Sequence, residues 1–302
     1  VVLAAALVSG CDVRWGGARV ELEEPAPPPR PAEGDDAAPV SIPSLPRPPV
    51  LYVAQLDPDG EARAVPAARL GPEGLEPLGW PDRPPQAFLD RFAATFQSPG
   101  AELPLLAEGG RAGTLILGER RSPVNAGCPT ASVGRILLPP GGRVPPWSFA
   151  RTPVDGGALQ ASAPGPPTSS RIRTFAPIIA ERLLRDAGVA RPFLARRVDL
   201  QAVTFPGDTA PGMAATYVIN DTLEAAPPPG GPSASLFFLA RFDRSEGFVP
   251  VWTRVRSYSG AGEKEILAWM GWIRTASGPT HLVRRVTADG IRLAAFRPEG
   301  ES

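Results

Sequence analysis

The distribution of proline constrains the fold of this chain more than any other feature of its 302 residues. Between Glu21 and Val50, ten of the thirty residues are proline, and few large apolar side chains stand among them. Proline lacks the backbone N–H that helices and sheets use, and a segment of this kind cannot bury enough surface to offset the entropy lost on ordering. We therefore predict that residues 11–49 are a disordered, extended tether and that the folded body begins near Val50.

The charges of the whole chain balance, with 31 basic and 31 acidic residues. Lys264 is the single lysine, so arginine supplies nearly all of the positive charge. Nucleic-acid binding depends on clustered Lys and Arg that neutralise phosphates, so this balance argues against a nucleic-acid partner. A hydrophobic content of 43% is enough for a substantial core. We expect a folded body after the tether.

An apolar run, VVLAAALVSG, occupies residues 1–10 and is directly followed by Cys11. Its length is that of a signal-peptide h-region and about half of what a membrane-spanning helix needs. The last residues, VSGC, resemble the lipobox of bacterial lipoproteins, in which a small residue precedes the cysteine that is acylated. Neither Met nor a basic n-region precedes Val1, so we interpret residues 1–10 as the h-region of a truncated lipoprotein signal peptide. The alternative is a buried apolar strand or helix.

The resemblance to bacterial lipoproteins implies that Cys11 carries a lipid, which would anchor the protein to a membrane without spanning it. It also implies a location in the cell envelope, periplasmic or on the outer-membrane side. The expected partners are the membrane itself, through the N-terminal lipid, and an envelope protein or polymer. An acylated Cys11 would leave Cys128 without a partner for an intramolecular disulfide.

Two modules are predicted beyond the tether, residues 50–155 and residues 171–302, joined by a linker over 156–170 that is rich in Gly, Pro and Ser. In the first module, apolar alternation around glycine-containing turns predicts hairpins over 50–70 and 102–118. Between them, helical spacing predicts a short amphipathic helix with an apolar face formed by Phe88, Leu89, Phe92 and Phe96.

The second module opens with the strongest helical pattern, for which we expect Thr174 as the N-cap, Pro177 in the first turn and Gly188 as the stop. Its expected apolar face consists of Phe175, Ile178, Ile179, Leu183 and Leu184. Seven strand-length segments follow: 192–205, 214–220, 235–242, 248–258, 265–274, 280–287 and 291–296. Neighbouring segments are expected to pair. We therefore predict an α+β fold, mostly antiparallel β-sheet with two short amphipathic helices, preceded by the disordered tether.

Few side chains in the sequence can carry chemistry. His281 is the single histidine, and Cys128 is the single cysteine after Cys11, so a zinc or iron site with three or four Cys and His ligands is excluded and no cofactor is expected. The weak catalytic candidates are a Cys128–His281 pair and a carboxylate pair, Glu263 with Glu265. Structural roles are the alternatives: a small buried thiol, a hydrogen-bonded histidine and a solvated strand edge.

The most suggestive surface lies in the segment 248–258. A period of two places Trp252, Arg254, Arg256 and Tyr258 on one face of a strand. Arginine and tryptophan are enriched at interfaces and form cation–π contacts, so we predict that these four residues form a binding face. A cation–π ladder that covers the sheet is the alternative. The sequence thus predicts a binding or structural module outside the cytoplasm, with an envelope hydrolase of unrecognised type as the alternative.

Overall fold

The computed structural model describes residues 43–57, 60–71, 74–81, 83–107, 109–121, 130–142, 146–153, 167–275 and 278–297. Residues 1–42, which include Cys11, lie outside the described residues, as do Cys128 and most of the linker predicted over 156–170. In the described parts, fourteen strands form three antiparallel sheets, and two α-helices pack against them. The predicted α+β class is therefore wrong. The protein is mainly β, because the sheets pack on one another and each helix only covers one sheet surface.

The first half of the described chain forms a closed barrel. Six strands follow the order β1-β7-β4-β5-β6-β2, and an additional pairing between β2 and β1 closes the ring, while β3 extends β2. Since every strand of the ring pairs on both sides, this sheet has no free edge except at β3. The elements of this half are β1 (Val50–Leu56), β2 (Glu61–Gly71), β3 (Gly74–Glu76), α1 (Gln86–Phe96), β4 (Glu102–Ala107), β5 (Gly110–Arg120), β6 (Ser132–Leu137) and β7 (Trp147–Arg151).

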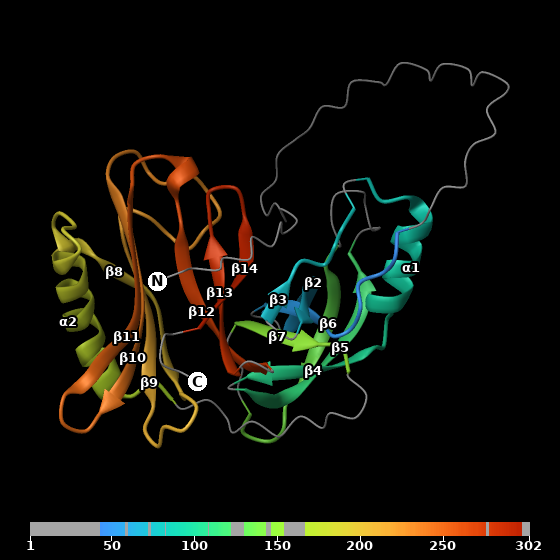
Figure 1. Cartoon of the computed structure of the whole chain (residues 1–302), viewed down its shortest axis with the longest axis horizontal. Coiled ribbons are helices and arrows are strands. Elements are labelled where there is room, and N and C mark those ends of the chain that lie inside the picture. The colour runs from blue at the N-terminus through green and yellow to red at the C-terminus, as the bar shows by residue number, and fades with distance from the viewer. Residues whose placement is uncertain are drawn as a thin grey trace, which may run out of the picture.

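Helix α1 covers the interior of the barrel on the side away from the other sheets (Figure 1). Its buried face contains Phe88, Leu89, Phe92, Ala93 and Phe96, so the predicted apolar face is confirmed. The helix is also held by one buried hydrogen bond, which the hydroxyl of Tyr52 on β1 donates to the carbonyl of Phe96 at 2.6 Å. Burial raises the pKa of Tyr52, which keeps this donor protonated.

The second half of the described chain forms two further sheets, of order β11-β10-β9-β8 and β12-β13-β14. All seven predicted strand segments contain a strand. The layers run from α2 to the four-stranded sheet, the three-stranded sheet and the barrel (Figure 1). The elements are α2 (Ser170–Asp186), η1 (Pro192–Leu194), β8 (Arg196–Val203), β9 (Gly212–Ile219), β10 (Ser233–Asp243), β11 (Gly247–Tyr258), η2 (Ala261–Glu263), β12 (Ile266–Thr275), β13 (Gly278–Val286) and β14 (Ile291–Phe296).

Strand β12 crosses the face of the four-stranded sheet and presents backbone carbonyls to it. Three neighbouring strands, β10, β9 and β8, each supply one side-chain donor. The acceptors are the backbone carbonyls of every second residue from Glu265, which directly precedes β12, to Trp269. Ser235 Oγ donates to Glu265 O at 2.6 Å, Thr216 Oγ1 to Leu267 O at 2.7 Å and Gln201 Nε2 to Trp269 O at 3.3 Å. These bonds satisfy polar groups on the edge strand of the three-stranded sheet, so they fix how the two sheets sit together.

Helix α2 begins earlier than predicted. The N-cap is Ser169, whose hydroxyl accepts the N–H of Ile172 at 3.3 Å, and not Thr174. Pro177 consequently lies inside the helix and not in its first turn. The predicted start was wrong because a serine pair directly before Arg171 offers an equally good cap one turn upstream.

The predicted apolar face of α2 is also partly wrong, since Phe175 and Ile178 face solvent. The small side chains of Ala176 and Ala180 allow the helix to approach the sheet closely and take the positions that larger residues were expected to fill. The buried residues of α2 are Ile172, Ala176, Ile179, Ala180 and Leu184.

Candidate functional site

The strand face predicted to bind a partner is covered by the three-stranded sheet along much of its length. Trp252 stacks on Phe296 of β14, with ring centroids 4.1 Å apart. Tyr258, at the other end of the face, is buried and donates its hydroxyl to Asp221 Oδ2 at 2.6 Å. The period of two predicted that Trp252 and Tyr258 lie on one face of the strand. In the structure neither is open to a partner, since Trp252 packs on β14 and Tyr258 is buried against Asp221.

The two arginines between them converge on one carboxylate. Arg254 Nε lies 3.1 Å from Glu265 Oε1, and Arg256 Nε lies 3.5 Å from the same oxygen. From β13, Arg285 Nη2 reaches Glu265 Oε2 at 2.8 Å. Three guanidinium groups therefore share one carboxylate, whose side chain is only 10% exposed. Such a cluster carries two more positive charges than negative ones.

Three members of this cluster, Arg256, Arg285 and Glu265, line a polar cleft of about 380 Å³, and Arg254 supports Glu265 from outside it. Arg292 of β14 also lines the cleft and stands directly opposite Arg285 in the strand register, a like-charge pairing that sheets normally avoid. The side chain of Arg256 is 49% exposed and, among the described residues, its only polar contact is the one with Glu265. The remaining N–H groups of Arg256 are therefore available to a ligand in the cleft. Two further carboxylates, Glu263 and Asp289, lie at the same cleft.

A buried ion pair lies at the base of this cleft. Lys264 Nζ donates to Asp221 Oδ1 at 2.7 Å, and the two side chains are each 1% exposed. The same ammonium also donates to three carbonyls: those of Thr222 at 3.3 Å, Glu224 at 3.0 Å and Ala226 at 3.0 Å. One side chain thus holds the loop after β9 against η2. The sequence signal for this network is that Lys264 is the single lysine of a chain with thirty arginines.

Tyr258 completes the network from β11, because its hydroxyl and the ammonium of Lys264 bind the two oxygens of the same Asp221 carboxylate. Burial raises the pKa of Tyr258, and the neighbouring Asp221 carboxylate raises it further. The tyrosine therefore remains a hydrogen-bond donor over the whole physiological range. Its role is to position Asp221, and through it the floor of the cleft.

The candidates for catalysis are placed less favourably. His281 has no exposed surface and lies among the rings of Phe205, Trp269 and Phe296, with centroid distances of 6.2, 5.4 and 5.5 Å. Its proposed partner, Cys128, lies outside the described residues, so the pair stays a prediction. Of the two carboxylates, Glu265 is committed to the three arginines, and Glu263 Oε2 accepts the backbone N–H of Ser259 at 3.3 Å.

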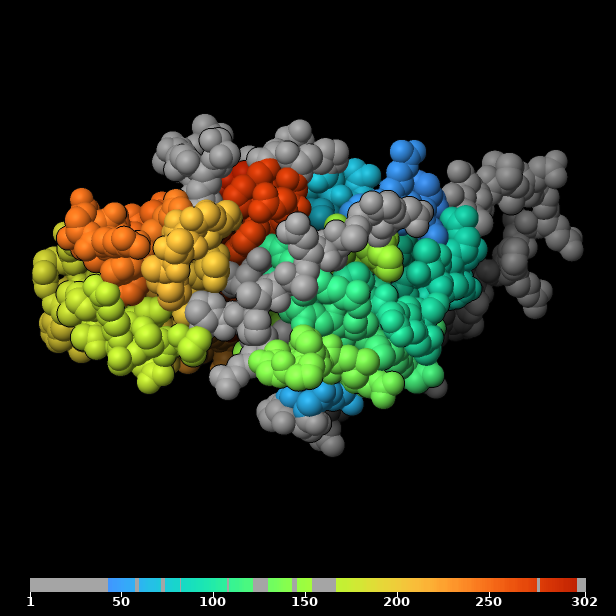
Figure 2. Space-filling view, turned by 90° about the horizontal axis from the view of Figure 1, so that it is seen from below, coloured from blue at the N-terminus to red at the C-terminus, as the bar shows by residue number. Residues whose placement is uncertain are grey.

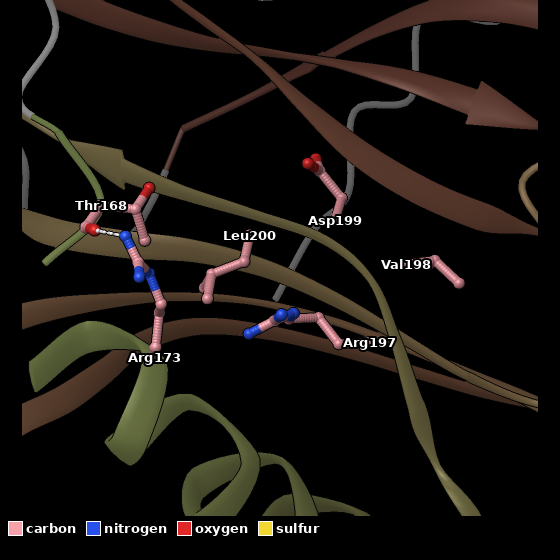
Figure 3. A pocket seen from close by; sticks show the side chains of 6 residues that line it. All are labelled: Thr168, Arg173, Arg197, Val198, Asp199 and Leu200. Atoms are coloured by element: carbon pink, nitrogen blue, oxygen red, sulfur yellow. Dashed lines mark hydrogen bonds between the residues drawn. The ribbon is translucent and has the colours of Figure 1, made fainter. Parts of the chain in front are cut away.

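A second, smaller groove of about 290 Å³ lies between the start of α2 and β8 (Figure 3). The guanidinium groups of Arg173 and Arg197 reach into it from the two elements, and Arg173 donates to the carbonyl of Thr168 at 2.8 Å. The carboxylate of Asp199 points to the opposite side of the strand, where Gln201 donates to it. The charged residues that line the groove are two arginines and Asp199.

Burial raises the pKa of Asp199, and this effect outweighs the hydrogen bond from Gln201 and the charge of Arg284, which both lower it. Strongly perturbed carboxyl groups in clefts are candidates for acid–base chemistry. Here, however, the carboxyl group faces the packed side of β8, away from the groove of Figure 3. We assign Asp199 to the packing of the two sheets.

Comparison with protein-family models, curated proteins and solved structures finds no significant match to this chain. Within the described residues, no helix combines the length and the apolar character needed to cross a membrane. The same residues contain no group of three or more Cys, His, Asp and Glu side chains arranged to hold a metal ion. The arrangement that remains as a candidate site is the arginine-lined cleft around Glu265.

Proposed function

We propose that the protein is a lipid-anchored component of the bacterial cell envelope whose β-rich body is a binding module for an anionic group. The anchoring rests on the apolar run that ends in Cys11 and resembles a lipobox. The binding role rests on one observation, the cleft lined by Glu265 and by two of the three arginines that share its carboxylate.

The chemistry of this cleft suits a carboxylate or a phosphate. A guanidinium presents a planar fork of N–H donors that matches the oxygens of both groups, and charge-assisted bonds of this type are the strong ones. Arg285 and Arg292, which stand opposite each other on β13 and β14, both line the cleft and supply it with two further guanidinium groups. Glu265 contributes by holding the arginines in place before a ligand arrives.

The floor of the cleft supports the same conclusion. Lys264, Asp221 and Tyr258 form a buried network that fixes the loop after β9, and binding sites gain affinity when their supporting residues are ordered in advance. The ligand that fits best is an acidic group of an envelope polymer. The hydrolase alternative has less support, because His281 is enclosed by aromatic rings and Glu265 is held by three arginines.

The cleft can be tested with inorganic phosphate and glucuronate as simple anionic probes. A ligand that binds only the folded protein raises its stability, by about 1.4 kcal/mol at ten times the dissociation constant. We expect both probes to raise the melting temperature relative to chloride at equal ionic strength. Arg256→Gln should remove most of this rise.

The matched control is Arg135→Gln, which changes an exposed arginine on the barrel strand β6. It should leave the response to phosphate and glucuronate unchanged. An equal response in both variants, or none in the unmodified protein, would contradict the assignment of the cleft.

A further inference from the structure

The outward side of α2 carries a stripe of exposed arginine and apolar side chains. Arg171, Phe175, Ile178, Arg182 and Arg185 follow one another at spacings of four, three, four and three, which places them along one helix face. Ile178 is 60% exposed and Phe175 is 40% exposed. The opposite face of α2 supplies most of the contacts with the sheet, although Arg171 lies over the ring of Phe242 and Phe175 contacts Phe248. Ile178, Arg182 and Arg185 are the part of the stripe that points away from the sheet.

The 3₁₀-helix η1 extends the apolar part of this surface. It follows α2 in the chain and packs against that helix. The side chains of Phe193 and Leu194 are 69% and 52% exposed. In the described parts of the chain, six large apolar side chains are exposed, and four of them lie on α2 and η1. We call the outward side of residues 170–197 the α2–η1 face.

The charge of the segment that carries the α2–η1 face departs strongly from that of the whole chain. Residues 170–197 contain seven arginines against Glu181 and Asp186, an excess of five positive charges in a chain whose formal net charge is zero. All seven arginines are exposed: Arg171, Arg173, Arg182, Arg185, Arg191, Arg196 and Arg197. Exposed phenylalanine, leucine and isoleucine among arginines is the composition of helices that lie in the interface of an anionic membrane.

We propose that the α2–η1 face binds the surface of an anionic phospholipid bilayer. Phe193, Leu194 and Ile178 would enter the headgroup region, and the arginines would contact lipid phosphates. The groove of Figure 3 lies at the edge of this face, where Arg173 and Arg197 converge on a space that suits a phosphate group. A second copy would account for the apolar side chains but would bring the same excess of positive charge to the contact.

The position of the face in the molecule fits this role. Helix α2 is the outermost layer at one end, and the barrel lies at the other (Figures 1 and 2). A bilayer could therefore lie against α2 without contacting the barrel. The inference goes beyond the anchored binding module proposed above and does not depend on it, since the α2–η1 face needs no acyl chain.

The test uses the expected mature chain, which begins at residue 11, with Cys11→Ala, so that neither the apolar run of residues 1–10 nor an acyl chain contributes to binding. Its partitioning is measured by flotation with vesicles of phosphatidylglycerol and phosphatidylcholine in equal parts, and with vesicles of phosphatidylcholine alone. We expect binding to the anionic vesicles only, and weaker binding as salt rises. Arg182→Gln with Arg185→Gln should lower the partition coefficient about 25-fold, at about fivefold for each arginine. Ile178→Ser with Leu194→Ser should lower it by at least about tenfold.

Three variants serve as controls and should bind like the parent. Arg135→Gln and Leu137→Ser change exposed residues on the barrel, and Arg256→Gln disables the cleft around Glu265. Equal binding to neutral vesicles, no binding to anionic ones, or no effect of the α2–η1 variants would overturn the proposal. Self-association that Ile178→Ser abolishes would assign the face to a second copy and would also overturn it. None of these outcomes bears on acylation of Cys11 or on the cleft.

Discussion

The buried pair of Lys264 and Asp221 gives the sharpest prediction on stability. Replacing Lys264 by Met keeps an unbranched apolar stem but removes the ammonium, which leaves the carboxylate of Asp221 buried without its cation. Breaking a buried pair in this way costs about 3–5 kcal/mol. The three carbonyls bound by Lys264 Nζ also lose their donor, so we expect the upper part of this range.

The assay is equilibrium unfolding in urea at neutral pH, followed by tryptophan fluorescence. A matched control is Arg185→Met, which breaks the surface pair with Glu181, whose side chains are 64% and 45% exposed. Exposed pairs contribute about 0–1 kcal/mol, so this control should unfold nearly as the parent does. The contrast between the two variants isolates the effect of burial.

A second variant separates the ion pair from general disruption of the loop. Adding Asp221→Asn to Lys264→Met removes the stranded charge and leaves an amide that can still accept the hydroxyl of Tyr258. The double variant should therefore be more stable than Lys264→Met alone. A cost for Lys264→Met no larger than that of Arg185→Met would refute the reasoning, as would strict additivity of the two changes.

Three further predictions concern single hydrogen bonds and one carboxyl group. Tyr52→Phe removes the buried bond to Phe96 O and should cost about 1–2 kcal/mol in urea unfolding. Thr216→Val removes the donor to Leu267 O and should cost about 1–3 kcal/mol, measured in the same way; a cost below that of an exposed substitution would contradict the account of β12. Burial raises the pKa of Asp199, so the folded protein holds this proton at a pH where the unfolded chain has lost it. Stability should therefore fall as pH rises above about 4, the pKa of an unfolded aspartate, and Asp199→Asn should flatten this fall in melts recorded across that range.

The local elements of the fold could be predicted from the sequence, but the closure of the barrel could not. Turn residues and alternation located the strands before and after Gly60, and helical spacing located the buried phenylalanines of α1. The ring closes through pairings of β7 with β1 and with β4, and these strands are far apart in the chain. No local periodicity encodes such partners, which is why a mainly β architecture was mistaken for α+β.

Helix α2 shows a different limit of sequence reasoning. Apolar residues at helical spacing predicted one buried stripe, but Phe175 and Ile178 lie outside it because the sheet accepts Ala176 and Ala180 instead. Helical spacing predicts which residues share a face of the helix. It does not predict how closely the sheet approaches that face. These two apolar side chains, which were predicted to be buried, are exposed beside arginines. The membrane inference rests on this exposed surface.

Only part of the candidate site could be predicted from the sequence. The period of two correctly placed Arg254 and Arg256 on one face of β11, and Glu265 was named as a carboxylate of interest. The sequence could not show that these residues meet, because the contact depends on how the three-stranded sheet covers β11. Arg285 joins them from β13, and nothing in its local sequence marked it.

The anchoring of the chain through Cys11 is tested most directly by intact mass spectrometry of the membrane fraction, with the full gene expressed in its native host. The account predicts a chain that begins at Cys11 and carries the mass of two or three acyl chains. Cys11→Ala should leave the chain unacylated and should abolish anchoring that resists high salt. An unmodified chain that retains residues 1–10 would contradict the account.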